Sequence, residues 1–156
     1  MFASNYSCMG KINARKSKYK GINFQSDLEK DFYQKAEKAK IPFQYEPHSI
    51  TLIDKFTLEV GEFYQHWGKK FIKRGGNIDS IDYTPDFFYD TGKLFIYCEC
   101  KGRANESYPF RRKLFLRYLE RSCHPYVFFE PKTKKDNTEV IEIVKTLIYN
   151  HPYELE

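Results

Sequence analysis

Residues 83–100 read Tyr83-Thr-Pro-Asp-Phe-Phe-Tyr89, then Asp90-Thr-Gly-Lys93, then Leu94-Phe-Ile-Tyr-Cys-Glu-Cys100. The two outer segments are rich in aromatic and apolar residues, and the four residues between them are typical of a tight turn. The stretch therefore predicts a β-hairpin. Its second strand is apolar on both faces, which is typical of a strand in the middle of a sheet that is covered on both sides.

Helical patterns lie on either side of this hairpin. Ser26-Asp-Leu-Glu29 is a capping box that begins a helix, and Pro42 stops that helix. Further predicted elements are a strand over 49–60, an amphipathic helix with a basic face over 109–121, a strand over 126–129, and a last helix capped by Asn137 or Thr138. The stretch 61–80 is ambiguous, although the spacing of Phe63, Tyr64, Trp67 and Phe71 fits a short helix. This order predicts an α/β fold with a mixed sheet of four to five strands flanked by helices.

Composition narrows the class of protein. The chain has 156 residues, of which 41% are hydrophobic and 18% aromatic, and these fractions exclude a disordered chain. No apolar run approaches the roughly 20 residues that a membrane span needs, and no secretory signal is visible at the N-terminus. We therefore expect a cytoplasmic protein with no membrane partner. Cys98 and Cys100 lack zinc-ligand spacing and are expected to pack as small apolar residues.

Positive charge is concentrated in two places. The formal net charge is +5, and residues 1–26 carry basic residues but no acidic one, so the whole excess lies there. We divide the chain into a basic arm over 1–23 and a single domain over 24–156. A second basic cluster occupies the segment 101–121. Basic clusters are often solvated surface, but they also bind nucleic-acid backbones. The candidates for that contact are Lys16, Lys18, Lys20, Arg103, Arg111, Arg112, Lys113 and Arg117.

Two charged residues fall inside the apolar hairpin. Residues two apart on a strand point to the same side, so Glu99 and Lys101 share one face of the second strand. Charges at that depth are costly unless they are paired or bind something. Asp86 lies at the start of the first strand, and the hairpin brings it close to Glu99. Two neighbouring carboxylates repel, and a bound Mg²⁺ relieves that repulsion, because this hard cation prefers oxygen ligands.

Pro85-Asp86 followed by Glu99-Cys100-Lys101 resembles the signature of the PD-(D/E)xK nuclease superfamily. The closer resemblance is to phage endonucleases of the endonuclease I type, which resolve Holliday junctions. It extends over about residues 24–118. The matching stretches are Phe24-Gln-Ser-Asp-Leu-Glu29, Phe43-Gln-Tyr-Glu-Pro47, Tyr83-Thr-Pro-Asp-Phe87, Cys98-Glu-Cys-Lys-Gly102 and Arg111-Arg-Lys113. The tract 54–80 is longer than the usual connection of that family, and the segment after 130 has no counterpart.

The resemblance implies a three-layer, restriction-endonuclease-like core and a metal-dependent endonuclease that hydrolyses DNA. It implies that Asp86, Glu99 and Glu29 ligate Mg²⁺, with Mn²⁺ as a substitute. The Cys100 carbonyl is a further candidate ligand, and Lys101 orients the attacking water or the phosphate. It also implies branched DNA as the substrate, the host cytoplasm as the location, and a homodimer, because resolving a junction takes two cuts.

Several alternatives remain open from the sequence. A DNA-end, nicking, transposition or restriction enzyme would share the same core. A catalytically silent nucleic-acid-binding protein would keep the basic surface without the metal, and a structural phage component would bind neither. Individual residues also have plain structural explanations: Glu29 fits a capping box, Glu99 and Lys101 fit an ion pair, and the Arg111–Lys113 cluster fits a solvated helix face.

Overall fold

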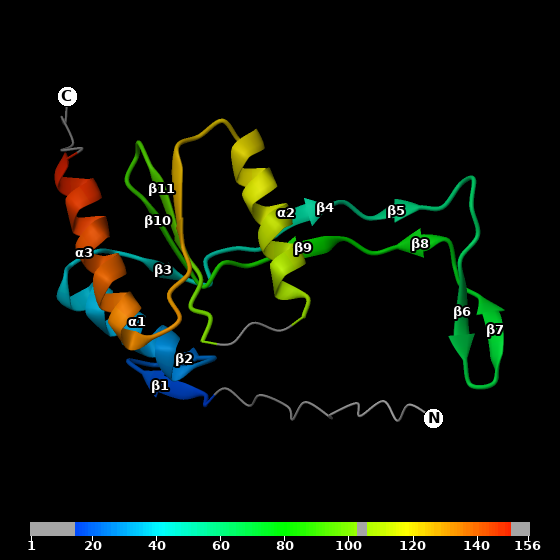
Figure 1. Cartoon of the computed structure of the whole chain (residues 1–156), viewed down its shortest axis with the longest axis horizontal. Coiled ribbons are helices and arrows are strands. Elements are labelled where there is room, and N and C mark those ends of the chain that lie inside the picture. Colours follow the sequence, from blue (N-terminus) through cyan, green and yellow to red (C-terminus); the bar gives the residue numbers. More distant parts are fainter. Residues whose placement is uncertain (1–14, 103–105, 151–156) are drawn as a thin grey trace, which may run out of the picture.

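The computed structural model describes residues 15–102 and 106–150. Its central sheet has four strands in the order β12 (Tyr126–Phe129), β11 (Phe95–Cys98), β10 (Phe87–Asp90) and β3 (Gln44–Tyr45). β11 and β12 are parallel, and the other two pairs are antiparallel. The described helices are α1 (Asp27–Lys38), α2 (Tyr108–Arg121) and α3 (Lys134–Asn150). The predicted α/β fold with a mixed sheet is confirmed (Figure 1).

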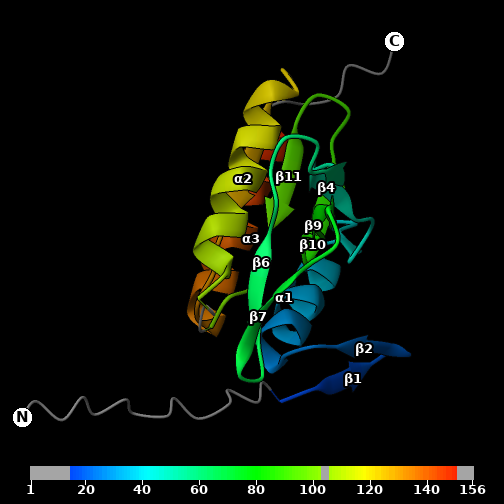
Figure 2. The same cartoon turned by 90° about the vertical axis from the view of Figure 1, so that its right-hand side faces the viewer.

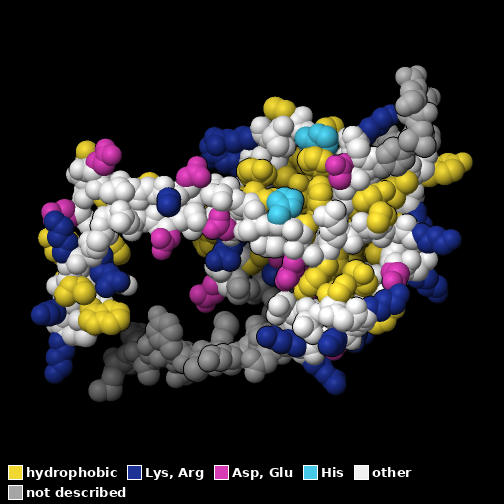
Figure 3. All heavy atoms as spheres, turned by 180° about the vertical axis from the view of Figure 1, so that it is seen from behind, with side chains coloured by type: hydrophobic (Ala, Val, Ile, Leu, Met, Phe, Trp, Pro, Cys, Tyr) yellow, Lys and Arg dark blue, Asp and Glu magenta, His cyan; other side chains and the backbone are white. Residues whose placement is uncertain are grey.

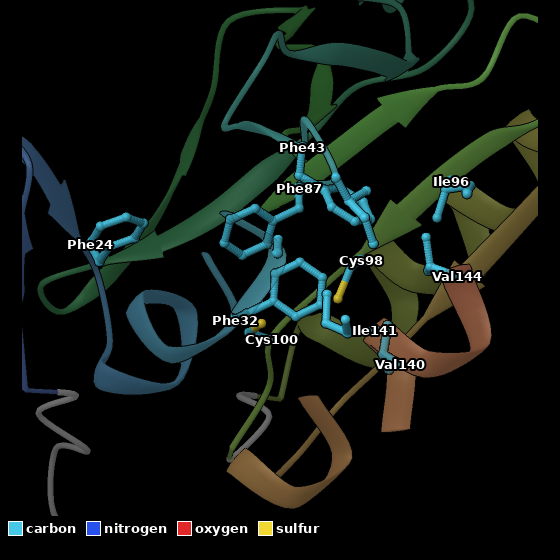
Figure 4. Close-up of a cluster of buried hydrophobic side chains, with 12 residues drawn as sticks. Phe24, Phe32, Phe43, Phe87, Ile96, Cys98, Cys100, Val140, Ile141 and Val144 are labelled. Atoms are coloured by element: carbon cyan, nitrogen blue, oxygen red, sulfur yellow. The ribbon is translucent and has the colours of Figure 1, made fainter. Parts of the chain in front are cut away.

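Helices cover both faces of this sheet. Side chains alternate along β11, so Ile96 and Cys98 face α1 and α3, whereas Phe95 and Tyr97 face α2. On the α1–α3 side, Phe32 and Phe87 stack 4.6 Å apart between ring centroids and fill the centre of the core (Figure 4). Both cysteines of β11 and its extension are buried free thiols in this core, as the sequence predicts.

A second core lies between the sheet and α2. Phe115 is fully buried and stacks on Tyr83, with 4.4 Å between the ring centroids. Tyr97 meets the same ring edge-on at 5.2 Å. Aromatic pairs of this kind add to the stability that burial provides. The charged cluster described below lies on the chain segments that follow Tyr83 and Tyr97.

The predicted hairpin is present. Phe87 pairs with Cys98 and Asp90 with Phe95 in an antiparallel register. The turn contains Gly92, whose positive φ of 83° is unstrained for glycine. β11 lies between β10 and β12, so the apolar strand is interior, as its sequence predicts.

The N-terminal boundary differs from the predicted arm. Residues 1–14 lie outside the described residues, but β1 (Ser17–Tyr19) and β2 (Ile22–Phe24) form an antiparallel hairpin. Tyr19 and Ile22 pack against the core on the α1–α3 side, so the folded unit begins near residue 17 rather than at 24. Each of the two strands has only three residues, so the alternating pattern is too short to predict this hairpin from the sequence.

The tract 50–83 is a long two-stranded ribbon, which we call the ribbon. Its strands are β4 (Ile50–Ile53), β5 (Phe56–Thr57), β6 (Tyr64–Trp67), β7 (Lys70–Lys73), β8 (Asn77–Ile78) and β9 (Ile81–Tyr83). β4 pairs with β9, β5 with β8 and β6 with β7, all antiparallel. The ribbon leaves the domain beside α2 and projects far from it (Figures 1 and 2).

The ambiguous stretch 61–80 is therefore β-structure, and the short helix that its aromatic spacing also fits is not formed. The aromatic spacing there fits a helix, but Gly68 has a φ of 64° and begins a two-residue turn between Trp67 and Lys70. A positive φ at this position suits the right-handed twist of a hairpin. Hairpin pairing between β6 and β7 thus outweighed the helical spacing of the aromatic residues.

The last helix begins earlier than predicted. Its N-terminal cap involves Thr133, whose hydroxyl accepts a hydrogen bond from the Asp136 amide at 3.2 Å, and the Asp136 carboxylate accepts one from the Thr133 amide at 3.0 Å. The proposed caps Asn137 and Thr138 lie inside the helix. Asn137 is fully buried and donates to the Leu28 carbonyl at 3.0 Å and to Asp31 at 2.9 Å, so it joins α3 to α1.

Replacing Asn137 by Ala is expected to lower the free energy of unfolding by about 1–3 kcal/mol, because buried polar groups on α1 lose their partner. Chemical denaturation measures this change. Thr138→Ala, at the neighbouring exposed position, is the matched control and should change stability by less than about 0.5 kcal/mol. Equal stability of the Asn137 variant and the wild type would contradict a role for this residue in joining the helices.

Within the described residues, no helix combines the length and the apolar character needed to cross a bilayer.

Candidate active site

The hairpin brings three charged side chains together at one end of the central sheet. Beyond β11, the Glu99 amide donates to the Phe129 carbonyl at 2.9 Å and the Lys101 amide donates to the Pro131 carbonyl at 2.9 Å. The chain therefore continues along β12 in the direction of β11, and alternation keeps Glu99 and Lys101 on the face opposite Cys98 and Cys100. The sequence predicted this shared face.

Glu99 is the most deeply buried member, with only 4% of its side chain exposed. One carboxylate oxygen, Oε1, lies 2.7 Å from the Lys101 ammonium. The other, Oε2, accepts hydrogen bonds from the Tyr83 hydroxyl at 2.8 Å and from the Asp86 amide at 3.3 Å. Burial, followed by the charge of Glu99, raises the pKa of Tyr83 well above its usual value, so Tyr83 remains a hydrogen-bond donor.

Asp86 joins the cluster from the start of β10. Its Oδ2 accepts a hydrogen bond from the Cys100 amide at 2.7 Å, which fixes the carboxylate next to Glu99. Burial raises the pKa of Asp86 well above its usual value, and the charges of Glu99 and Glu29 raise it further. The Lys101 ammonium only partly opposes this effect. Because the pKa is raised, a negative charge on Asp86 is unfavourable here, and a cation beside the two carboxylates would offset that cost.

Lys101 is protonated in this arrangement. Burial by itself lowers the pKa of Lys101, but the adjacent Glu99 carboxylate outweighs this effect, and Asp86 and Glu29 add to it, so the pKa lies above its usual value. Its ammonium also lies 5.0 Å from the centre of the Tyr108 ring. A lysine held in this state supplies positive charge and hydrogen-bond donors rather than a general base.

Glu29 lies near this cluster but is engaged elsewhere. The Ser26 hydroxyl donates to Glu29 Oε1 at 2.7 Å, and Oε2 accepts from the Tyr45 hydroxyl at 2.8 Å and from the Gln25 amide at 2.9 Å. The Ser26 hydroxyl in turn accepts from the Glu29 amide at 3.1 Å, so Ser26 caps the helix as predicted, and the Glu29 carboxylate reaches back to the Ser26 hydroxyl and the Gln25 amide. The charge of Glu29 still reaches Asp86 and Lys101, whose pKa values it raises.

A pocket opens over the cluster. Its walls include Asp86, Glu99 and Lys101 from the sheet, together with Tyr108 and Arg111 from the first turns of α2. Ser49 and Asp82, at the base of the ribbon, also line it. The pocket therefore combines buried carboxylates with an exposed guanidinium at its rim, and α2 and the ribbon both border it.

The residues predicted to contact nucleic acid differ in their surroundings: some have acidic partners and others are exposed. Arg112 is paired with Glu130 at 2.7 Å, and Lys20 is paired with Glu37 at 2.6 Å, so both have acidic partners in the fold. Arg103 lies outside the described residues. The exposed members are Lys16 and Lys18 near β1, and Arg111, Lys113 and Arg117 on α2.

The side chains of this cluster provide part of the ligand set that a hard cation prefers. Among the described residues, no group of three His, Cys, Asp or Glu side chains is placed to hold a metal ion. Two adjacent carboxylates are nevertheless present, and Mg²⁺ is commonly held by one or two carboxylates and completes its shell with water. Asp86 and Glu99 would hold such an ion. Glu29 is not among the residues that line the pocket, and its carboxylate is held by Ser26, Gln25 and Tyr45. Cys100 could contribute only its backbone carbonyl, since its thiol faces the core.

Three contributors were not singled out from the sequence. Tyr83 donates to Glu99, Tyr108 lies beside Lys101, and Glu130 binds both the Tyr108 hydroxyl at 2.8 Å and Arg112. The only sequence signal for them was position: Tyr83 begins the motif-bearing segment, and Tyr108 begins the basic helix. Their partners come from other elements, which spacing along the chain does not reveal.

These features define a mixed α/β protein with a buried carboxylate–lysine cluster that opens to a pocket. The chain belongs to the family described as "Protein of unknown function (DUF1064)", whose model matches residues 9–143. No curated protein and no solved structure gives a significant match to the chain.

Proposed function

We propose that the protein is a metal-dependent endonuclease of restriction-endonuclease-like fold that hydrolyses DNA phosphodiester bonds. The observation that carries the proposal is the cluster of Asp86, Glu99 and Lys101, brought together on adjacent strands beneath a pocket. A buried carboxylate, a partly buried one beside it and a lysine are costly for a protein to keep as structure alone. They are the groups that hydrolysis of a phosphodiester needs: oxygen ligands for a cation, and a fixed positive charge.

A bound Mg²⁺ would activate water and offset the charge that develops on the phosphate. The chain supplies the rest. Asp86 and Glu99 would hold the cation, and the Cys100 amide and Tyr83 hydroxyl keep the two carboxylates in place. The Lys101 ammonium, protonated and partly exposed, orients the phosphate or the attacking water. Arg111 at the rim of the pocket binds the neighbouring backbone phosphate.

The proposed substrate is branched DNA, with a Holliday junction as the specific case, and the proposed assembly is a homodimer. Both rest on the resemblance in sequence, and the paired cuts of junction resolution are the reason for two copies. Light scattering of the protein with and without DNA measures the assembly. A monomer in both states would remove the dimer from the proposal and leave the hydrolytic chemistry in place.

The direct test incubates the protein with a labelled four-way junction and with a linear duplex of matched sequence, each with Mg²⁺, with Mn²⁺ and with EDTA. Junction-selective, metal-dependent cutting supports a resolvase. Equal cutting of both substrates keeps the nuclease and removes the preference for junctions. An absence of metal-dependent cutting of either substrate contradicts the enzyme.

The second candidate is a nucleic-acid-binding protein without catalysis. It is favoured by the Lys101–Glu99 ion pair, which satisfies both charges without a metal, and by the capping role of Glu29. This candidate predicts DNA binding that is the same with Mg²⁺ and with EDTA. The melting temperature would also be independent of Mg²⁺.

Arg111 and Arg112 are expected to differ despite being neighbours. Arg111→Ala should weaken DNA binding several-fold, because an exposed guanidinium at the pocket is lost. Arg112→Ala should instead act mainly on the fold near α2, since its guanidinium is held by Glu130. Fluorescence anisotropy with DNA and thermal melting separate the two effects, and identical behaviour of the two variants would contradict the assignment.

A further inference from the structure

The ribbon exposes several large aromatic side chains to solvent. Two-stranded hairpins are marginally stable by themselves, and exposed aromatic patches commonly mark interaction sites. On the ribbon, Trp67 is 66% exposed and Phe71 is 70% exposed, and Phe56, Phe63 and Tyr64 are exposed as well. The core accounts for none of these side chains, so the feature calls for a partner outside the domain.

Charge indicates what the partner is. The end hairpin, β6–β7 over residues 64–74, carries Lys69, Lys70, Lys73 and Arg74 and no acidic residue. Basic and hydrophobic side chains are mixed on this part of the surface (Figure 3). Lys73 pairs with Glu62 just outside the hairpin, which leaves an excess of positive charge at its end. The complementary partner is a polyanion.

Strand register distributes these residues over both faces of the hairpin. Tyr64 pairs with Lys73 and His66 with Phe71 on one face. Trp67 pairs with Lys70 on the other, where the Arg74 guanidinium lies 5.9 Å from the centre of the Trp67 ring. The Trp67 face thus offers an aromatic ring next to the cations of Lys70 and Arg74, and on the other face Tyr64 lies opposite Lys73, which also pairs with Glu62. A two-stranded ribbon fits the major groove of DNA, where cations on both faces would meet the phosphates of both strands.

The base of the ribbon is tied to the candidate active site. Thr51 and Asp82 are cross-strand partners joined by a 2.7 Å hydrogen bond, and Asp82 lines the pocket that contains Asp86. Ten residues lie between Ile53 and Tyr64. At about 3.3 Å per residue, the end hairpin lies up to roughly 35 Å from the base. This is close to one turn of duplex DNA, about 34 Å.

We propose that the end hairpin of the ribbon binds double-stranded DNA in a groove, about one helical turn from the phosphate that faces Asp86, Glu99 and Lys101. The identity of the nucleic acid rests on the proposed function. The juxtaposition of exposed rings and cations on both faces, at the end of a ribbon whose base borders the pocket, carries the inference. The ribbon would thereby hold a duplex arm against the domain while the pocket receives the backbone.

The test measures binding of the full-length protein to a fluorescent duplex and a four-way junction in EDTA, so that no cutting occurs. The hairpin variant is Lys69→Ala/Lys70→Ala/Arg74→Ala. The matched control is Lys38→Ala/Lys135→Ala/Lys145→Ala, which removes three charges from exposed positions on α1 and α3. We expect the hairpin variant to bind at least about tenfold more weakly near 0.1 M salt. The slope of log affinity against log salt should fall by about 2–3.

A second variant, Trp67→Ala/Phe71→Ala, tests the aromatic rings. It is expected to weaken binding while leaving the salt slope unchanged, because no charge is removed. Shortening the arms of the junction from about 15 to about 6 base pairs, less than one helical turn, should weaken binding by the wild type much more than by the hairpin variant. Circular dichroism checks that both variants keep the wild-type fold.

The proposal is overturned if the hairpin variant binds DNA as the control does at every salt concentration. It is also overturned if the wild type binds vesicles of phosphatidylserine and phosphatidylcholine through the hairpin but does not bind DNA. Hairpin-dependent DNA binding without metal-dependent cutting by the wild type would instead support this proposal and contradict the nuclease. Cutting by the wild type, together with unchanged DNA binding by the hairpin variant, would support the nuclease and contradict this proposal.

Discussion

Lys101→Ala is expected to reduce metal-dependent DNA cleavage by at least about 10²-fold, because a fixed positive charge at the reacting phosphate is worth that much in hydrolytic enzymes. Asp86→Asn is expected to reduce it further, by about 10³-fold or more, since one of the two adjacent carboxylates loses its charge. Initial rates on the preferred DNA substrate at saturating Mg²⁺ measure both effects. DNA binding in EDTA should persist in both variants.

The controls lie on the same hairpin. Lys93→Ala and Asp90→Asn change the same residue types at exposed positions near its turn, away from the pocket, and should cut at close to the wild-type rate. Cleavage that survives in Lys101→Ala and Asp86→Asn at the control rate would show that the cluster is structural. The nuclease proposal would then have lost the observation on which it rests.

Magnesium is expected to raise the melting temperature by about 5–10 °C at a concentration near a hundred times its dissociation constant, because it binds only the folded state. Asp86→Asn should abolish this shift. The same variant should melt higher than the wild type in EDTA, since it removes the charge repulsion that raises the pKa of Asp86. Differential scanning fluorimetry measures both changes.

The dependence on pH follows from the raised pKa of Asp86. Below about pH 3.8, its usual value, the carboxyl is protonated in both the folded and the unfolded state. As pH rises above that value, the unfolded chain ionises first, so the metal-free protein loses stability until the folded carboxyl also ionises. Because Mg²⁺ competes with that proton, the magnesium-induced shift should grow from pH 5 to pH 8. A shift that is constant over this range, or equal in Asp86→Asn, would contradict metal binding at Asp86.

Much of the fold was predictable because its signals are local. The capping box at Ser26 and Glu29 begins α1, and the apolar segments around the Asp90–Lys93 turn form the β10–β11 hairpin. Alternation along β11 placed Glu99 and Lys101 on one face, as the structure has them. The helical interpretation of the aromatic spacing at 63–71 was wrong. That spacing alone does not separate a helix from a twisted ribbon whose partner strand follows a glycine turn.

The sequence by itself determined α1, the β10–β11 hairpin and the identity of the charged cluster, since capping, alternation and turn chemistry act between residues close in the chain. Only the tertiary structure decided which side chains pair with one another. Tyr83 reaches Glu99 across 16 positions, and Glu130 reaches Arg112 across 18. It also joined Glu29 to Tyr45, and it extended the ribbon away from the domain. Such contacts depend on how the layers pack, which no local pattern encodes.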